Sequence, residues 1–122
     1  MGLLVNGKWH DHWYDTKDHD GRFVRAEAQF RNWVTPDGSP GPTGRGDFPA
    51  EAGRYHLYIG HACPWAHRTL IFRRIKELED KISLSVVHWY MGENGWTFDP
   101  GDGVLPDPVN NARYLYEVYA AA

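Results

Sequence analysis

The sequence predicts an α/β protein whose centre is a strand, a helix and a second strand in that order. Residues 55–59 are rich in aromatic and β-branched side chains, which favours a strand. Residues 64–78 begin with proline and carry apolar side chains at helical spacing, whereas residues 82–87 alternate apolar and polar side chains. Such a unit has parallel strands joined by a right-handed crossover. The charged positions of the helix are predicted to form its solvent face: Arg73, Arg74, Lys76, Glu77 and Glu79.

Less regular segments flank this unit. Residues 1–53 are mostly polar and are predicted to form a long irregular N-terminal extension, followed by a second part over residues 54–122. The proline and glycine residues between Pro36 and Gly46 exclude regular structure and predict a surface connector. No Gly-Lys-Ser/Thr follows that would make this connector a phosphate-binding loop. Residues 111–122 are predicted to form a final helix.

Composition narrows the class of protein. The chain has 122 residues, which suits one domain, and 42% of them are hydrophobic, which is too many for a disordered chain. The net charge of −3 gives no reason to expect a nucleic acid or an anionic membrane as partner. No apolar run approaches the ~20 residues that span a bilayer, and the first residues do not resemble a signal peptide. With one unpaired cysteine, the sequence predicts a cytoplasmic protein.

Cys63 is the only cysteine, and it lies between the first predicted strand and Pro64. Proline is favoured in the first turn of a helix, so Cys63 is predicted to precede the helix directly. The free N–H groups and the positive end of the helix dipole stabilise a thiolate at such a position. Three residues further on stands Ala66, so no disulfide can form within the chain and an external thiol must resolve a mixed disulfide. Cys63 is therefore predicted to be a nucleophile.

Other interpretations of this region remain as alternatives. A free cysteine is often a buried structural thiol, which would make the chain a non-catalytic binding module. A cysteine–histidine pair of the protease kind lacks its usual local sequence. No metal is predicted, because two candidate ligand sets match no well-established zinc spacing: His61, Cys63 and His67, and His10, His12 and His19.

Trp96 lies in a turn just beyond the second predicted strand. The carboxyl ends of parallel strands meet at one edge, so Trp96 can reach the edge at which Cys63 is expected. Its residue type fits a contact in a binding site and ordinary packing equally well. Both roles stay open on these grounds.

Four stretches of the chain carry a shared family pattern. They are Tyr55-His56-Leu57-Tyr58 through Cys63-Pro64-Trp65-Ala66-His67-Arg68, Arg22-Phe23-Val24-Arg25, Phe30-Arg31-Asn32-Trp33, and Glu93-Asn94-Gly95-Trp96-Thr97-Phe98. Together they resemble the glutathionyl-hydroquinone reductases, the Xi class of glutathione transferases. A bare Cys-Pro-x-Ala would be less specific, because Omega-class transferases and glutaredoxins share it.

The resemblance implies a fold, a reaction and a set of site residues. The implied fold is a thioredoxin-like domain, of which the strand–helix–strand unit and the following helix form an incomplete version. Cys63 would be the catalytic nucleophile, Trp96 would contact glutathione, and Pro64 and Trp65 would shape the pocket around the sulfur. The implied reaction reduces glutathionyl-hydroquinones with glutathione as co-substrate and no tightly bound cofactor, in a full-length protein that is a homodimer. A monothiol glutaredoxin-like or Omega-like reductase remains the alternative.

Length separates this chain from that family, whose members are much longer. The sequence therefore predicts the N-terminal, nucleophile-bearing part of such a reductase, without the C-terminal helical domain. We expect the 122-residue chain alone to show little or no glutathione-dependent activity.

Overall fold

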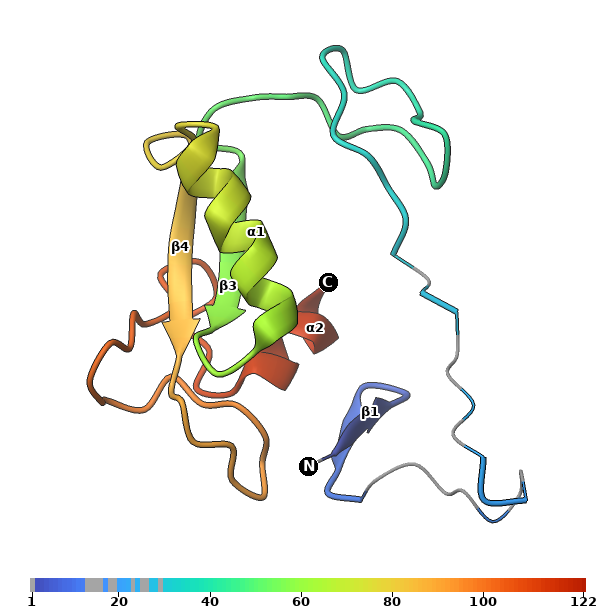
Figure 1. The fold of residues 1–122 in the computed structure, drawn as a ribbon, viewed down its shortest axis with the longest axis vertical. Coiled ribbons are helices and arrows are strands. Elements are labelled where there is room, and N and C mark those ends of the chain that lie inside the picture. Colours follow the sequence, from blue (N-terminus) through green and yellow to red (C-terminus); the bar gives the residue numbers. More distant parts are fainter. Residues whose placement is uncertain (1, 13–16, 18–19, 23, 25–26, 29) are drawn as a thin grey trace.

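A two-stranded parallel sheet lies at the centre of the chain. The structure is a computed structural model that describes residues 2–12, 17, 20–22, 24, 27–28 and 30–122. β3 (Tyr55–Gly60) pairs with β4 (Ile82–Val87), and α1 (Pro64–Ile75) connects them. The predicted strand–helix–strand unit is confirmed. Both strands end at the same edge of the sheet, so the segments that follow them lie close together (Figure 1).

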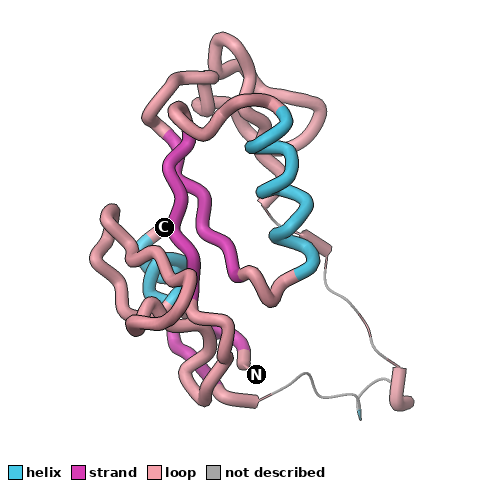
Figure 2. Tube along the Cα trace, turned by 60° about the vertical axis from the view of Figure 1, so that its left-hand side comes forward, coloured by secondary structure: helices cyan, strands magenta, loops and turns pink. Residues whose placement is uncertain are grey.

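The two faces of this sheet differ in chemistry. Leu84 of β4 borders α1, together with Leu70 and Ile75 of that helix. The opposite face is polar, because His56 lies beside two serines of β4: its Nδ1 is 2.6 Å from Ser83 Oγ and its Nε2 is 2.8 Å from Ser85 Oγ. α2 (Leu115–Ala121) lies on that second side, so that the two helices flank the sheet (Figure 2).

The buried core is small and lies toward the carboxyl edge of the sheet. Its apolar members are Ile59, Val86, Val87 and Phe98. Leu105 pairs with Val86 as an isolated antiparallel bridge, with N–H···O distances of 2.9 and 3.0 Å. The edge that carries Cys63 and the Trp96 turn is therefore also the best-packed part of the sheet.

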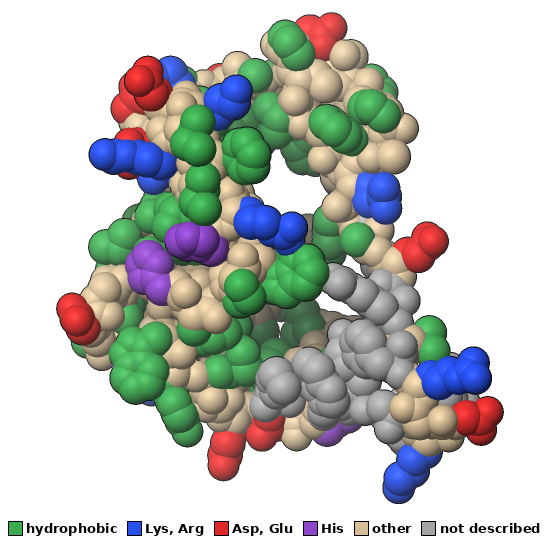
Figure 3. All heavy atoms as spheres, viewed as in Figure 1, with side chains coloured by type: hydrophobic (Ala, Val, Ile, Leu, Met, Phe, Trp, Pro, Cys, Tyr) green, Lys and Arg blue, Asp and Glu red, His purple; other side chains and the backbone are tan. Residues whose placement is uncertain are grey.

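α1 ends at Ile75, earlier than the predicted residue 78. The backbone leaves the helix at Lys76, and Glu77 adopts a left-handed conformation with φ of 51°. Apolar side chains lie at the surface over this helix (Figure 3), and Phe72 and Ile75 are 62% and 66% exposed. The apolar stripe of the helix is therefore only partly packed against the sheet.

The placement of Arg73 on the solvent face of this helix was wrong. Its side chain is part-buried, and its Nε donates to the carbonyl of Ile82 at 2.7 Å while its Nη2 donates to that of Glu79 at 2.9 Å. The guanidinium satisfies two carbonyls of the connection between α1 and β4. These hydrogen bonds to backbone carbonyls outweigh the helical pattern that predicted a solvent-facing Arg73.

The N-terminal extension is not irregular throughout, because it begins with a β-hairpin. β1 (Leu3–Val5) pairs antiparallel with β2 (Lys8–His10). The two residues between them, Asn6 and Gly7, both have positive φ, of 48° and 75°. Asn-Gly is the preferred pair for a two-residue hairpin turn, because that turn needs positive φ at both positions. The sequence signal was present but stands between strands of only three residues each.

The connector between the extension and β3 folds back on itself. Thr35 N–H donates to Phe48 O at 3.0 Å, and Ala50 N–H donates to Thr35 O at 2.8 Å. Between Pro36 and Gly46, all of which is described, there is no helix or strand, as predicted. The closed loop stands away from the sheet (Figure 1). Across the described segments, no helix is long and apolar enough to cross a bilayer.

Candidate active site

Cys63 occupies the residue that precedes α1. Its backbone is extended, with φ of −97° and ψ of 110°, and Pro64 begins the helix. Its N–H donates to Gly60 O at 2.9 Å and its carbonyl accepts from His67 N–H at 3.2 Å. The side chain is half-buried and makes no capping hydrogen bond. Cys63 therefore directly precedes the helix, as the sequence predicted, and its thiol does not serve as the helix cap.

The start of α1 carries a cation, Arg68, and no acidic side chain in its first turn. Arg68 lies over the ring of Trp65, with the guanidinium carbon 4.7 Å from the ring centroid, and Trp65 is 61% exposed. A helix N-terminus and a cation both favour a bound anion, so the first turn of α1 is suited to an anionic group of a ligand.

Trp96 lies in the turn that follows β4, and its backbone is held from two sides. His88 N–H donates to Thr97 O at 2.8 Å, which ties the turn to the end of the sheet. Leu115 N–H donates to Trp96 O at 2.9 Å, which ties it to the first residue of α2. The half-buried indole lines an open hollow of about 810 Å³ between β1, β2 and α2.

The predicted site residues share one edge of the sheet but not one pocket. Cys63, Pro64 and Trp65 lie at the start of α1, after β3, and the Trp96 turn follows β4 (Figure 1). The hollow that Trp96 lines contains none of the other three. The common location fits the prediction, whereas the roles of the individual side chains stay predictions.

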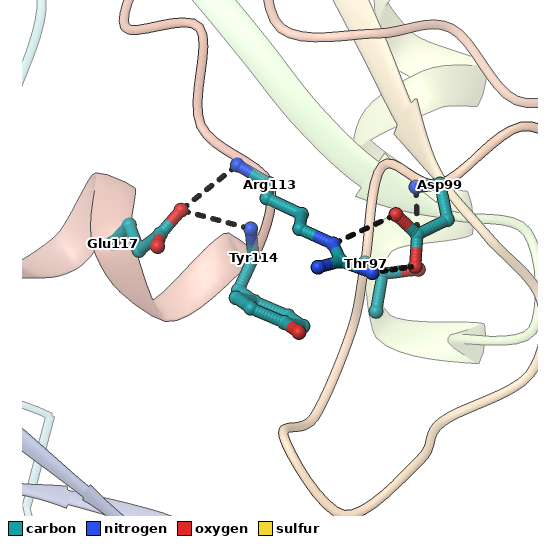
Figure 4. Close-up of polar contacts among 5 residues, drawn as sticks. All are labelled: Thr97, Asp99, Arg113, Tyr114 and Glu117. Carbon is teal, nitrogen blue, oxygen red and sulfur yellow. Dashed lines mark hydrogen bonds and ion pairs between the residues drawn. The ribbon is translucent and has the colours of Figure 1, made fainter.

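An ion pair and a capping box fix the segment beside Trp96 (Figure 4). Arg113 donates to both carboxylate oxygens of Asp99, at 3.0 and 3.3 Å, and Asp99 N–H donates to Thr97 Oγ1 at 3.3 Å. Glu117 accepts from the N–H groups of Arg113 and Tyr114, at 2.8 and 3.0 Å. α2 begins at Leu115, four residues after the predicted start, because Tyr114 is its N-cap and forms the capping box with Glu117.

Asp107 anchors the chain between β4 and α2 beneath the sheet. It is 4% exposed and its carboxylate accepts from Tyr58 Oη at 2.9 Å and from Val109 N–H at 2.9 Å, with further N–H donors at Asn110 and Ala112. Burial by itself would raise the pKa of Asp107, but these hydrogen bonds outweigh burial and hold the pKa below its usual value. The Tyr58 hydroxyl has a raised pKa, through burial and through its bond to Asp107.

Three positions that shape this region were not predicted from the sequence: Trp9, Asp107 and Arg113. Asp107-Pro108 is a turn signal, and the bond from Val109 N–H to Asp107 is the local contact that such an aspartate makes. Trp9 and Arg113 carry no local signal, because their partners Glu93 and Asp99 are distant in sequence.

The structure describes some, but not all, of the candidate metal-ligand histidines and family-motif residues. Throughout the described ranges, no three His, Cys, Asp or Glu side chains are arranged to hold a metal ion. His10 and His12 meet edge to face, with ring centroids 5.6 Å apart. His19, Phe23 and Arg25 lie outside the described residues.

Comparison with known sequences finds relatives that match the whole chain. No protein-family model matches it. The glutathionyl-hydroquinone reductase PcpF of Sphingobium chlorophenolicum is 57% identical over 122 residues, which is 100% of this chain and 36% of PcpF. The glutathionyl-hydroquinone reductase YqjG of Escherichia coli K12 is 56% identical over 123 residues, 100% of this chain and 38% of YqjG. The chain thus spans little more than a third of the length of these relatives.

Solved structures agree with these sequence matches. The glutathione-bound structure of Escherichia coli YqjG superposes on 98% of this chain and 34% of its own, with a TM-score of 0.80 and 49% identity. The Xi-class transferase of Natrialba magadii covers 98% of this chain and 33% of its own, with a TM-score of 0.74 and 43% identity. The fold is thus a partial thioredoxin-like domain, and over its whole length the chain belongs with the N-terminal part of the glutathionyl-hydroquinone reductases, the Xi class of glutathione transferases.

Proposed function

We propose that the protein containing this sequence reduces glutathionyl-hydroquinones to hydroquinones with glutathione as co-substrate. The observation that carries this proposal is the position of Cys63 directly before α1. Its side chain is half-buried and makes no capping hydrogen bond, and the first turn of the helix has no acidic residue. The names of the two relatives that match the whole chain support the same reaction. The sulfur of glutathione is a natural target for a lone thiolate.

The proposed reaction proceeds through a mixed disulfide. The Cys63 thiolate attacks the glutathione sulfur of the substrate, a Cys63–glutathione disulfide forms, and the bond between that sulfur and the aromatic carbon breaks. The electron pair of the broken bond stays with the ring, which takes up a proton and leaves as the hydroquinone. A second glutathione thiolate then attacks the glutathione sulfur of the mixed disulfide. Oxidised glutathione leaves and Cys63 returns as a thiolate, so the two electrons come from two thiols.

Three side chains are proposed to assist Cys63. Trp96 would lie against bound glutathione with its indole, since a half-buried aromatic side chain gives a large contact surface at little cost in conformational entropy. Pro64 and Trp65, both exposed beside the thiol, would bound the space around the reacting sulfur. No tightly bound cofactor is needed for these steps.

Cys63 substitution in the protein as its gene encodes it tests this proposal. Cys63→Ser and Cys63→Ala should each lower the rate of hydroquinone and oxidised-glutathione formation by at least about a thousandfold, because the nucleophile is lost. Far-UV circular dichroism checks that both variants fold. Full activity in a folded Cys63→Ser variant would refute the proposed mechanism.

Two alternatives give different results in related assays. The Schizosaccharomyces pombe relative, 43% identical over 111 residues, is named glutathione S-transferase omega-like 2. An enzyme of more general thiol-transfer type would reduce a mixed disulfide of glutathione and 2-mercaptoethanol faster than a glutathionyl-hydroquinone. A non-catalytic module with a structural thiol would leave Cys63 inert to iodoacetamide at pH 6, whereas the proposal expects rapid alkylation. Homodimer formation, a cytoplasmic location and the division at residues 53 and 54 stay predictions.

A further inference from the structure

Trp9 of the N-terminal hairpin contacts the body of the protein. In β2 the flanking Lys8 and His10 are exposed, whereas Trp9 is half-buried. Its ring stacks on Tyr116 of α2, with centroids 5.5 Å apart and an interplanar angle of 17°. Tyr116 in turn stacks on Tyr114 at 5.4 Å and 8°. The hairpin is therefore held by an aromatic stack that ends at the cap of α2.

The same indole also holds the turn that carries Trp96. Trp9 Nε1 donates to the carbonyl of Glu93 at 2.8 Å, three residues before Trp96. Gly95, the residue next to Trp96, is buried and has φ of 75°, and a Cβ built on it would lie 2.8 Å from the Trp9 ring. The Trp9 ring thus rests on the backbone of the turn, at a position where only glycine fits.

Trp9 and Trp96 face one hollow. The two indoles line the open space of about 810 Å³ that β1 and α2 enclose. Hydrogen bonds at Trp96 and Thr97 connect the turn to β4 and α2, but nothing in those contacts fixes residues 93–95. Within the turn, Gly95 N–H bonds only to Gly92 O, at 3.0 Å. Among the described residues, Trp9 therefore adds a hydrogen bond from outside the turn to its outer half.

We propose that Trp9 is a positioning residue for Trp96, and that the N-terminal hairpin sets the affinity of the site for glutathione. This inference rests on the proposed function, because it takes Trp96 as a glutathione contact. Trp9 acts through the turn, and the hollow that it lines with Trp96 does not include Cys63, so its loss weakens glutathione binding without changing the chemistry of the thiol. An interaction that binds ground state and transition state equally alters KM and leaves kcat unchanged.

Graded substitution of Trp9 in the protein as its gene encodes it tests the inference. Trp9→Phe keeps an aromatic ring on Tyr116 but loses the donor to Glu93, and we expect KM for glutathione to rise about threefold. Trp9→Ala loses both contacts, and we expect a rise of about tenfold. In both variants kcat and the rate of Cys63 alkylation by iodoacetamide should stay within about twofold of the parent values.

Trp33 supplies the matched control. It is another tryptophan of the extension, 50% exposed, and its Nε1 donates to Thr43 Oγ1 at 2.9 Å, within the connector loop. Trp33→Phe and Trp33→Ala change the same residue type away from the Trp96 turn. Neither should alter KM for glutathione. If they raise it as much as the Trp9 variants do, a general loss of stability explains both and the inference fails.

A double-mutant comparison separates the inference from the proposed function. If Trp9 acts through Trp96, Trp9→Ala adds no further rise in KM to a Trp96→Ala variant, because the positioned side chain is already gone. Should Trp96→Ala leave KM unchanged, the proposed role of Trp96 is wrong. Should Trp96→Ala raise KM while Trp9→Ala does not, or should the two effects multiply, the inference about Trp9 is wrong and the role of Trp96 stands.

Discussion

Asp107 offers a sharp test of what holds the region between the sheet and α2. Its buried carboxylate receives hydrogen bonds from the Tyr58 hydroxyl and from three backbone N–H groups. Asp107→Ala removes all of these acceptors at once. Val109 and Asn110 are exposed, so water can take over their N–H groups at little cost.

The expected loss in the free energy of unfolding for Asp107→Ala comes from the two donors that water reaches less easily. Tyr58 and Ala112 are both half-buried, and each donor left without a partner costs about 1–1.5 kcal/mol. We therefore expect Asp107→Ala to lower the free energy of unfolding by about 2–3 kcal/mol. Asp107→Asn keeps one acceptor oxygen and should lose roughly half of that amount.

Urea denaturation, followed by tryptophan fluorescence and by far-UV circular dichroism, measures these changes. The exposed Asp102 provides a control, since Asp102→Asn should change the free energy of unfolding by less than about 0.5 kcal/mol. A cycle with Tyr58→Phe should show a coupling of about 1 kcal/mol between Tyr58 and Asp107. A loss below about 0.5 kcal/mol for Asp107→Ala, with no coupling to Tyr58, would refute the reasoning.

The carboxylate of Asp107 also makes the free energy of unfolding depend on pH in the acidic range. Because the folded pKa of Asp107 lies below its ordinary value, the unfolded chain binds a proton first as pH falls. The contribution of Asp107 is therefore complete above about pH 4, near the unfolded pKa, and is lost as pH falls through the lower folded pKa. Asp107→Asn should flatten the loss of stability in that acidic range, and an unchanged profile would contradict the assignment.

Further changes have expected results of their own. The pKa of His56 is lowered chiefly by burial; the charge of Asp107 opposes this shift and that of Arg73 adds to it, so the folded state favours the neutral ring. Stability should fall as pH drops from about 6.5 toward the lower folded pKa of His56, and His56→Gln should remove that slope in urea titrations at successive pH values. Glu117→Ala removes the acceptor for two N–H groups that cap α2 and should lower the free energy of unfolding by about 1 kcal/mol in the same assay, whereas Glu117→Gln should lose less.

The sequence predicts well those features that local chemistry decides. The alternation in residues 82–87 and the proline after Cys63 lie within a few residues of the structure they specify, and both predictions are confirmed. The hairpin turn at Asn6-Gly7 is equally local, but three-residue strands give too short a pattern to stand out. The end of α1 was placed too late, because the backbone leaves the helix at Lys76 and Glu77 is left-handed, although the apolar spacing continues to Leu78. The inward turn of Arg73, which bonds the carbonyl of Ile82, is likewise a contact that no periodicity shows.

The surroundings of Trp96 could not be predicted in this way, because distant residues build them. Trp9 reaches Glu93 across 84 positions, and Tyr58 reaches Asp107 across 49. A pattern within a short window contains only one partner of each pair. Aromatic residues such as Trp9 are common in strands for packing reasons, so their type alone does not reveal a distant contact.

This difference between local and distant determinants has a functional consequence. The setting of Cys63 is made by residues close to it in the sequence, from Gly60 to Arg68, through the strand end, the proline and the helix N-terminus. The setting of Trp96 is made by the hairpin and by the cap of α2. Substitutions near Cys63 should therefore alter the rate of thiol reactions, whereas substitutions at Trp9 or Arg113 should alter affinity for glutathione. Chemistry and binding in this site are thus expected to respond to two separate sets of residues, one readable from the sequence and one that only the fold brings together.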